Sequence, residues 1–267
     1  MSRFDLSGKS ALVTGGAQGL GEGFAFALAE AGADVVISDI QDDLGKQTAN
    51  RLAKVGQRTG FVHHDVTVED DWRNAVATTI DLLGGFDVLV NNAGIEITGL
   101  LTAFDPDDWR RMFDINVVGM GLGVKHAFAA MSPSGPAGSG GVVINVSSVA
   151  ATIAHPALAG YSASKSAVDR LTRVAARESG IFGYGVRVNC IYPGLVPTEM
   201  GTRLAGDIVT VGLAETVELA VRGVVEQTPS GRLGEVADMA SAVVFLASDA
   251  AQFINGAGIP VDGGMGM

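Results

Sequence analysis

Residues 10–21 read SALVTGGAQGLG, in which a short apolar run, Ser10 to Thr14, is followed by a glycine-rich turn and an Ala-rich helical pattern. Glycines at such a turn let the backbone bend sharply and come close to an anion. The helix that follows offers unpaired N–H groups and the positive end of its dipole. The turn follows a predicted strand and precedes a predicted helix, which is the context that a dinucleotide-binding turn requires. The stretch therefore predicts a first βαβ unit with a phosphate-binding turn.

The same alternation of short apolar runs and longer helical patterns continues along the whole chain. Further strands are predicted at 34–39, 59–63, 86–90, 141–146, 186–191 and 258–261. Helices are predicted at 20–32, 42–55, 67–83, 106–131, 160–179, 202–226 and 236–247. Continuously apolar strands that alternate with helices indicate a parallel sheet covered on both faces. We expect one α/β domain over residues 1–267, a doubly wound parallel sheet, with a substrate loop or lid at about 195–230.

Composition excludes several classes of protein. The 267 residues are 47% hydrophobic and 18% charged, and 18 Lys and Arg against 29 Asp and Glu give a net charge of −11. These values argue against a disordered chain, and the acidity argues against binding to nucleic acid or to anionic membranes. A single Cys excludes an internal disulfide and Cys-based metal sites, and no His, Asp or Glu cluster suggests another metal site. Without an apolar leader over residues 1–9 or a membrane-spanning segment, we expect a cytoplasmic protein.

Asp39 ends the second predicted strand, 18 residues after Gly21. A carboxylate at this position can accept hydrogen bonds from both ribose hydroxyls of an adenosine and repels a 2′-phosphate. No Lys or Arg lies within residues 15–21 or 34–43 to offset that repulsion. The pattern therefore predicts NAD as cofactor rather than NADP.

Five motifs together resemble those of the short-chain dehydrogenase/reductase family. They are Thr14-Gly-x-x-x-Gly-x-Gly21, Asn91-Asn-Ala-Gly94, Ser148, Tyr161-x-x-x-Lys165 and Pro193-Gly-x-x-x-Thr198. The resemblance extends from Gly8 to Gly264 and implies a Rossmann-like fold. It also implies a catalytic tetrad in which Tyr161 is the acid/base, Ser148 orients the substrate oxygen, Lys165 holds the nicotinamide ribose and Asn116 completes a water-mediated proton relay.

The Tyr–Lys pair can also be argued from its chemistry. A tyrosine phenol has a pKa of about 10, and lowering it to about 7 requires roughly 4 kcal/mol of selective phenolate stabilisation. One cation about 4 Å away supplies roughly that much at an effective dielectric constant of 20. Lys165 lies one helical turn after Tyr161 on the same face. We therefore expect Lys165 to lower the pKa of Tyr161.

The resemblance also implies residues that contact the cofactor and the substrate. The predicted cofactor contacts are Gly15, Gln18, Gly19, Leu20, Gly21, Asp39, Asp65, Val66, Asn92, Ala93, Gly94, Tyr161, Lys165, Pro193, Gly194, Val196 and Thr198. Glu96, just after the fourth strand, and His155, between Ser148 and Tyr161, are the predicted substrate contacts.

These features favour an NAD-dependent oxidoreductase that interconverts a hydrophobic secondary alcohol and its ketone, similar to bacterial hydroxysteroid and cyclic-alcohol dehydrogenases. A 3-oxoacyl-carrier-protein reductase is the alternative enzyme, against which Asp39 and the net charge of −11 both count. A non-catalytic dinucleotide sensor is a further alternative, but such a protein should lack the tyrosine or the lysine. The apolar helical segments 113–131 and 160–179 resemble those through which similar proteins dimerise, usually within a tetramer, so we expect a homotetramer.

Overall fold

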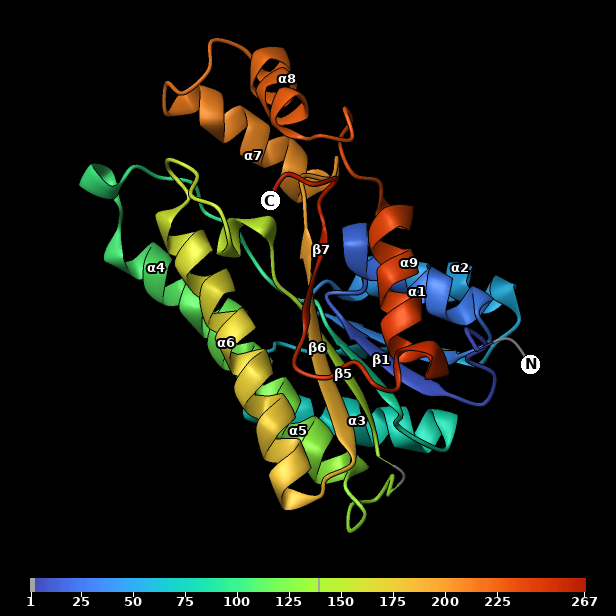
Figure 1. The fold of residues 1–267 in the computed structure, drawn as a ribbon. Coiled ribbons are helices and arrows are strands. Elements are labelled where there is room, and N and C mark those ends of the chain that lie inside the picture. The colour runs from blue at the N-terminus through green and yellow to red at the C-terminus, as the bar shows by residue number, and fades with distance from the viewer. Residues whose placement is uncertain (1–2, 139) are drawn as a thin grey trace.

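The computed structural model describes residues 3–138 and 140–267, so the first two residues of the N-terminal stretch lie outside it. Its centre is a seven-stranded parallel sheet with the order β3-β2-β1-β4-β5-β6-β7 (Figure 1). The strands are β1 Ser10–Thr14, β2 Asp34–Asp39, β3 Thr59–His63, β4 Val88–Asn91, β5 Gly141–Val146, β6 Val186–Pro193 and β7 Gly258–Val261. The predicted doubly wound parallel sheet is confirmed.

The strand order reverses between β1 and β4, which are neighbours in the sheet although two βα units separate them in the chain. In open α/β sheets this reversal opens a crevice outside the carboxyl ends of the strands, and ligands bind there. Thr14 and Asn91, the last residues of β1 and β4, therefore mark the position of the candidate site.

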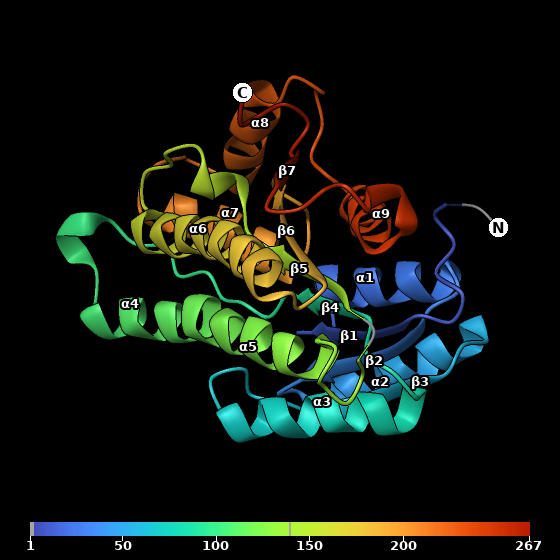
Figure 2. The ribbon, with the colours of Figure 1, turned by 60° about the horizontal axis from the view of Figure 1, so that its bottom comes forward.

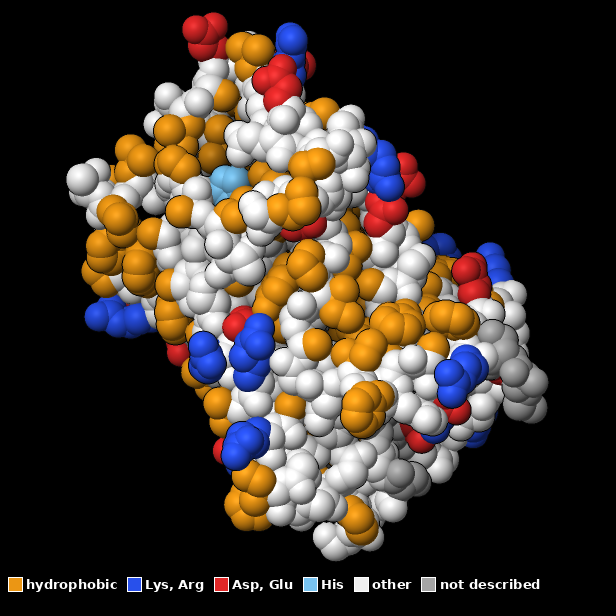
Figure 3. All heavy atoms as spheres, in the orientation of Figure 1, with side chains coloured by type: hydrophobic (Ala, Val, Ile, Leu, Met, Phe, Trp, Pro, Cys, Tyr) orange, Lys and Arg blue, Asp and Glu red, His pale blue; other side chains and the backbone are white. Residues whose placement is uncertain are grey.

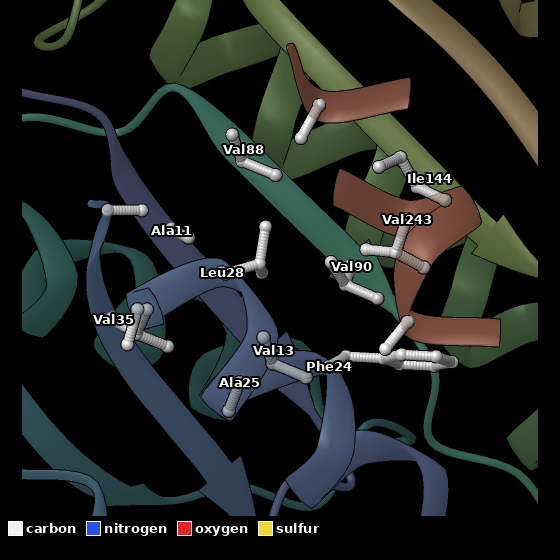
Figure 4. Close-up of a cluster of buried hydrophobic side chains, with 14 of the residues drawn as sticks. Ala11, Val13, Phe24, Ala25, Leu28, Val35, Val88, Val90, Ile144 and Val243 are labelled. Atoms are coloured by element: carbon white, nitrogen blue, oxygen red, sulfur yellow. The ribbon is translucent and has the colours of Figure 1, made fainter. Parts of the chain in front are cut away.

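Helices cover both faces of the sheet, as Figure 2 shows. One layer contains α1 Gly19–Glu30, α2 Asp42–Leu52 and α9 Val236–Ala247; the other contains α3 Glu69–Leu83, α5 Met120–Met131 and α6 Ala159–Phe182. Alternate strand residues face opposite layers, so that Val13 packs against α1 and α9 whereas Leu12 packs on the α3 side. In Figure 4, Phe24 and Leu28 of α1 lie close to Val243 of α9 and to the β1 and β4 valines.

Several predicted helices begin, end or divide at other residues in the structure. The helix predicted from residue 67 begins at Glu69, after Val68, and the Thr67 hydroxyl donates to Asp65 Oδ1 at 2.7 Å. Asp105 does cap α4, Pro106–Phe113, by accepting from the Asp107 amide at 2.8 Å. The predicted helix 106–131 is then divided by a π-helical segment, Asp114–Gly119, before α5 begins.

The predicted helix 202–226 is two helices, α7 Glu199–Thr210 and α8 Val217–Gln227. A turn at Val211 and Gly212 separates them, and Gly212 adopts φ +78°. Thr198 and Thr216 cap the two helices by accepting hydrogen bonds from Gly201 and Leu219 amides. Figure 1 shows the pair standing above the carboxyl ends of the strands, away from the two helix layers. Within the described residues, no helix combines the length and apolar character that a bilayer crossing requires.

Candidate active site

A cavity of about 1310 Å³ opens at the carboxyl ends of β1, β2, β4, β5 and β6 and continues beneath α7 and α8. Its wall contains every predicted cofactor and substrate residue and three members of the predicted tetrad, Ser148, Tyr161 and Lys165. Asn116 is not part of the wall and lies buried behind it. In Figure 3, hydrophobic side chains gather where α7 approaches the segment before α4. The structure thus brings the sequence-predicted residues to one site.

The glycine-rich turn has the backbone geometry of an anion-binding cradle. Gly15 and Gly19 adopt φ values of +61° and +62°, which side chains disfavour. A Cβ on Gly15 would lie 3.0 Å from the Ala93 Cα atom, and one on Gly21 would lie 2.1 Å from the Gly15 oxygen. Gln18 gives α1 no side-chain cap, so the first amides of the helix face the cavity without a side-chain partner. These features fit the pyrophosphate of a dinucleotide.

Hydrogen bonds join this turn to the end of β4. The Thr14 hydroxyl accepts from the Asn92 and Ala93 amides, both at 3.0 Å. The Asn92 side chain in turn donates to the Thr14 and Gly15 carbonyl oxygens at 2.9 and 3.1 Å. Asn91 points away from the cavity into the interior, where it donates to Met120 and Asn145. These four bonds tie the turn to β4 without using the amides of the turn, of which those of Gly16 and Ala17 donate to Ser38 and Asp39 of β2.

Asp39 lies at the cavity wall with both carboxylate oxygens engaged by backbone. Its Oδ2 accepts from the Ala17 amide and its Oδ1 from the Gln41 amide, each at 3.1 Å. Each oxygen retains a second lone pair for a ribose hydroxyl. The residues that line the cavity next to Asp39 are Ile40, Gln41, His64 and Asp65, none of which is Lys or Arg. The charge at this end of the cavity is therefore negative.

Tyr161, Ser148 and Lys165 meet on the opposite side of the cavity. Removal of the phenol from bulk water raises the pKa of Tyr161 to about 12, although a hydrogen bond with Ser148 lowers it. Burial also lowers the pKa of Lys165 to about 8. The Lys165 ammonium donates to the Val146 carbonyl at 2.9 Å and lies 5.7 Å from the centre of the Tyr161 ring. The expected lowering of the Tyr161 pKa by Lys165 is not found, because removal of the phenol from bulk water is the largest influence on that pKa and raises it.

Asn116 holds the segment after β4 in place. Its Oδ1 accepts from the Ile95 amide, and its Nδ2 donates to the Ile95 carbonyl, each at 2.8 Å. The Ser164 hydroxyl accepts from the same Nδ2 at 3.0 Å. A Cβ on Gly94 would lie 3.0 Å from Asn116 Oδ1 and 3.4 Å from Lys165 Nζ, so glycine permits this close packing. The side chain therefore positions residues 94–95 beside Lys165.

The cavity wall also contains residues that were not predicted, and two of them, Arg203 and Met265, come from distant parts of the chain. Arg203 of α7 donates from its guanidinium to the Glu96 carbonyl at 3.2 Å, a contact between residues 107 positions apart. Met265 belongs to the C-terminal tail, which folds back onto its own chain. No local pattern marks either position, although Arg203 is one of only two cationic residues in the segment 198–227 and could have drawn attention. Across residues 3–138 and 140–267, no three His, Cys, Asp or Glu side chains are grouped as metal ligands.

Comparison with known proteins extends these observations. Residues 15–266 match a family model described as Enoyl-(Acyl carrier protein) reductase. Trans-4-hydroxycyclohexanecarboxylate dehydrogenase of Sinomonas cyclohexanicum is 38% identical over 96% of this chain and 92% of its own. A 3-alpha-(or 20-beta)-hydroxysteroid dehydrogenase of Mycobacterium tuberculosis is 39% identical over 97% of this chain and 90% of its own.

Solved structures of other dehydrogenases share the fold of this chain. A 7α-hydroxysteroid dehydrogenase complexed with NADH and 7-oxo glycochenodeoxycholic acid has a TM-score of 0.87 at 30% identity, covering 98% of this chain and 96% of its own. A gluconate 5-dehydrogenase from Burkholderia cenocepacia in complex with NADP and tartrate has a TM-score of 0.84 at 34% identity, covering 98% and 97%. The chain belongs to the short-chain dehydrogenase/reductase family and resembles its cyclic-alcohol dehydrogenases.

Proposed function

We propose that the protein is an NAD-dependent oxidoreductase that interconverts a hydrophobic secondary alcohol and its ketone. The observation that carries the proposal is the meeting of Tyr161, Ser148 and Lys165 in the wall of one cavity with the glycine cradle of α1. A hydride carrier and a proton-transferring phenol can then act on the same carbinol. When bound, the nicotinamide supplies the hydride acceptor, or the hydride itself in the reverse direction.

The chain's own residues account for the proton. In alcohol oxidation the phenolate of Tyr161 accepts the hydroxyl proton, and in ketone reduction its phenol donates one. The Ser148 hydroxyl holds the substrate oxygen and hydrogen-bonds the phenol. Lys165 presents a buried ammonium to the Val146 carbonyl and to the ribose side of the cavity. Asn116 keeps Ile95 and Gly94 against Lys165, and the water relay expected for it belongs to this proposal.

The choice of NAD rests on Asp39. A 2′-phosphate would bring about two negative charges to a carboxylate that is already bonded to the Ala17 and Gln41 amides and cannot turn away without losing them. The cationic residues in the cavity wall are Lys165 and the arginines of α4 and α7, which come from other parts of the chain. Relatives with NADH and with NADP both match, so the proposal depends on this residue rather than on the comparisons.

The substrate class is inferred from the wall beneath α7 and α8, which we propose to be the substrate lid. The wall is largely apolar there: Leu204, Ile208, Leu213, Leu219, Ala220 and Val224 line it. Burial of a hydrocarbon ring against these side chains is favourable at about 25 cal/mol per Å². His155, partly buried on the opposite wall, completes the proposed substrate contacts. Relatives named for cyclohexane and steroid alcohols support this class.

A 3-oxoacyl-carrier-protein reductase is the second candidate, because the matching family model is described by another reductase of acyl-carrier-protein substrates. A carrier protein is itself acidic, and the net charge of −11 disfavours its docking. One assay distinguishes the alcohol dehydrogenase from the 3-oxoacyl reductase. Turnover of 3-oxoacyl thioesters with NADPH, without turnover of secondary alcohols with NAD, would replace the first proposal by the second.

The decisive experiment follows reduced nicotinamide by its absorbance with NAD or NADP and a panel of cyclic secondary alcohols. We expect turnover with NAD, and we expect Tyr161→Phe to lower kcat by about 10²–10⁴-fold while NAD binding is retained. Tyr184→Phe, outside the cavity wall, is the matched control. Retained turnover in Tyr161→Phe would contradict the assigned base, and tight NAD binding without any turnover would indicate a sensor.

We also propose a homotetramer in which α5 and α6 form one of the contacts. Val174, Ile181 and Phe182 of α6 leave between 48% and 65% of their surface exposed. Monomeric proteins rarely leave such apolar groups clustered on one side. Light scattering of the wild type and of Phe182→Glu tests this proposal, and a wild-type monomer would contradict it.

A further inference from the structure

One buried carboxyl oxygen in the cavity wall has no hydrogen-bond partner. Glu96 follows β4 and is only 3% exposed. Its Oε1 accepts from the Thr98 hydroxyl at 2.7 Å, whereas Oε2 contacts no donor among residues 3–138 and 140–267. Buried polar atoms are nearly always hydrogen-bonded, and an unsatisfied one destabilises the folded protein. Glu96 belongs to the cavity wall and its Oε2 is covered by neighbouring atoms, so a small movement of the side chain would let a ligand supply the missing donor.

The surroundings keep Oε2 free instead of pairing it. Arg203 is close enough to interact electrostatically with Glu96, yet its guanidinium donates to the Glu96 backbone carbonyl at 3.2 Å and forms no ion pair with the carboxylate. Asp207, one turn further along α7, adds a like charge on that side. The charge of Glu96 also raises the pKa of Tyr161, so the carboxylate interacts electrostatically with the phenol. Glu96 thus belongs to the part of the cavity wall beside α7, which is the substrate end.

We propose that Glu96 Oε2 binds a second hydroxyl of the substrate, so that the preferred substrates are hydrophobic diols in which one carbinol faces Tyr161. This inference rests on the proposed function and refines its substrate class. A hydroxyl fits better than an ammonium group, because the neighbouring Arg203 repels a cation. A hydroxyl can also donate to a carboxylate or accept from a carboxylic acid, whichever form the buried Glu96 adopts.

The test compares cyclohexanol with the isomeric cyclohexanediols in NAD-dependent oxidation. Hydrogen bonds to charged groups contribute enough to give a preference of about 10–100-fold. We expect at least one diol to have a kcat/KM higher than that of cyclohexanol by this factor, mainly through KM. Glu96→Leu should reduce this ratio to near one. Thr98→Val removes the partner of Oε1 only and should retain the preference.

A second measurement does not depend on turnover. With NAD present, the preferred diol should raise the melting temperature of the wild type more than cyclohexanol does, and Glu96→Leu should abolish the difference. Without ligand, Glu96→Leu should melt no lower than the wild type, because the unpaired oxygen is lost. If Glu96→Leu does not fold, Glu96→Gln, which keeps the size, replaces it and should reduce both preferences.

Three outcomes would overturn the inference. They are equal kcat/KM values for cyclohexanol and every diol, a diol preference that survives in Glu96→Leu, and a stronger preference for an aminocyclohexanol than for any diol. Absence of all alcohol turnover would overturn the proposed function instead. In that case the melting-temperature difference alone decides whether Glu96 binds a hydroxyl.

Discussion

The two ends of the cavity are built in different ways. At the nucleotide end, α1 buries Phe24, Leu28 and several small residues against the sheet, and the turn before it is tied to β4 by Thr14 and Asn92. At the substrate end, α7 buries only Ala205 and α8 buries no residue. The nucleotide end is part of the core, whereas α7 and α8 rest above it. A constant cofactor can be held by the core, while variable substrates are best held by elements that the core does not constrain.

The largest expected difference between the two ends is in stability. Leu28→Ala on α1 removes a fully buried side chain and should lower the free energy of unfolding by about 2–5 kcal/mol. Leu219→Ala on α8 removes one that is 46% exposed and should change it by no more than about 0.5 kcal/mol. Instead, Leu219→Ala should raise KM for hydrophobic alcohols by about tenfold. Urea denaturation measures the free energy of unfolding, and steady-state kinetics measures KM. Equal losses of stability in Leu28→Ala and Leu219→Ala would contradict the difference between the two ends.

Glycine substitutions test the same contrast through the backbone. Gly21→Ala places a Cβ 2.1 Å from the Gly15 oxygen, so it should cost about 1–3 kcal/mol of stability and weaken NAD binding. Gly206→Ala lies in α7 with open space around its Cβ and should stabilise the protein by about 0.5–1 kcal/mol. Thermal denaturation and NAD titration distinguish them. Destabilisation by Gly206→Ala would mean that α7 is packed more tightly than its burial indicates.

Cofactor choice should be altered at the nucleotide end alone. Asp39→Asn removes the charge and keeps the size, and it should raise the preference for NADP relative to NAD at least fivefold. This factor corresponds to a like-charge repulsion of about 1 kcal/mol at 4 Å in water. Asp43→Asn is the matched control, because that carboxylate is exposed in the first turn of α2 and lies outside the cavity wall. Ratios of kcat/KM for the two cofactors provide the measurement, and an equal change in both variants would remove Asp39 from its assigned role.

The smallest effect should be a shift in pH dependence that crosses from the substrate end to Tyr161. Oxidation needs the phenolate, so its kcat/KM should rise with pH, because burial raises the pKa of Tyr161 to about 12. The charge of Glu96 raises that pKa further, so Glu96→Gln should move the rise to lower pH. Profiles of kcat/KM against pH for cyclohexanol measure it. A shift to higher pH in Glu96→Gln would contradict the electrostatic effect of Glu96 on Tyr161.

Much of the fold was predictable because it depends on local periodicity. The strand positions 34–39 and 141–146 match the structure, since parallel strands buried on both faces are largely apolar. The position 59–63 also matches, although this edge strand is only partly buried. Boundaries were less predictable. The π-helical segment at Asp114–Gly119 arises where Asn116 bonds to Ile95, a contact that the sequence pattern of a helix does not indicate. The division of 202–226 into two helices occurs at Gly212, which adopts φ +78°, and before the Thr216 cap, both of which are local features that the helical pattern of the whole segment obscured.

The sequence by itself determined the parallel sheet, the glycine cradle, the carboxylate at residue 39 and the residues that meet in the cavity wall. Each of these features depends on short spacings along the chain and on strand ends that share one edge of the sheet. Only the tertiary structure decided how these groups behave. Burial raises the pKa of Tyr161 against the expected effect of Lys165. Arg203 meets Glu96 across 107 residues yet leaves Oε2 free. Desolvation and long-range contacts are properties of the packed chain, which no local pattern contains.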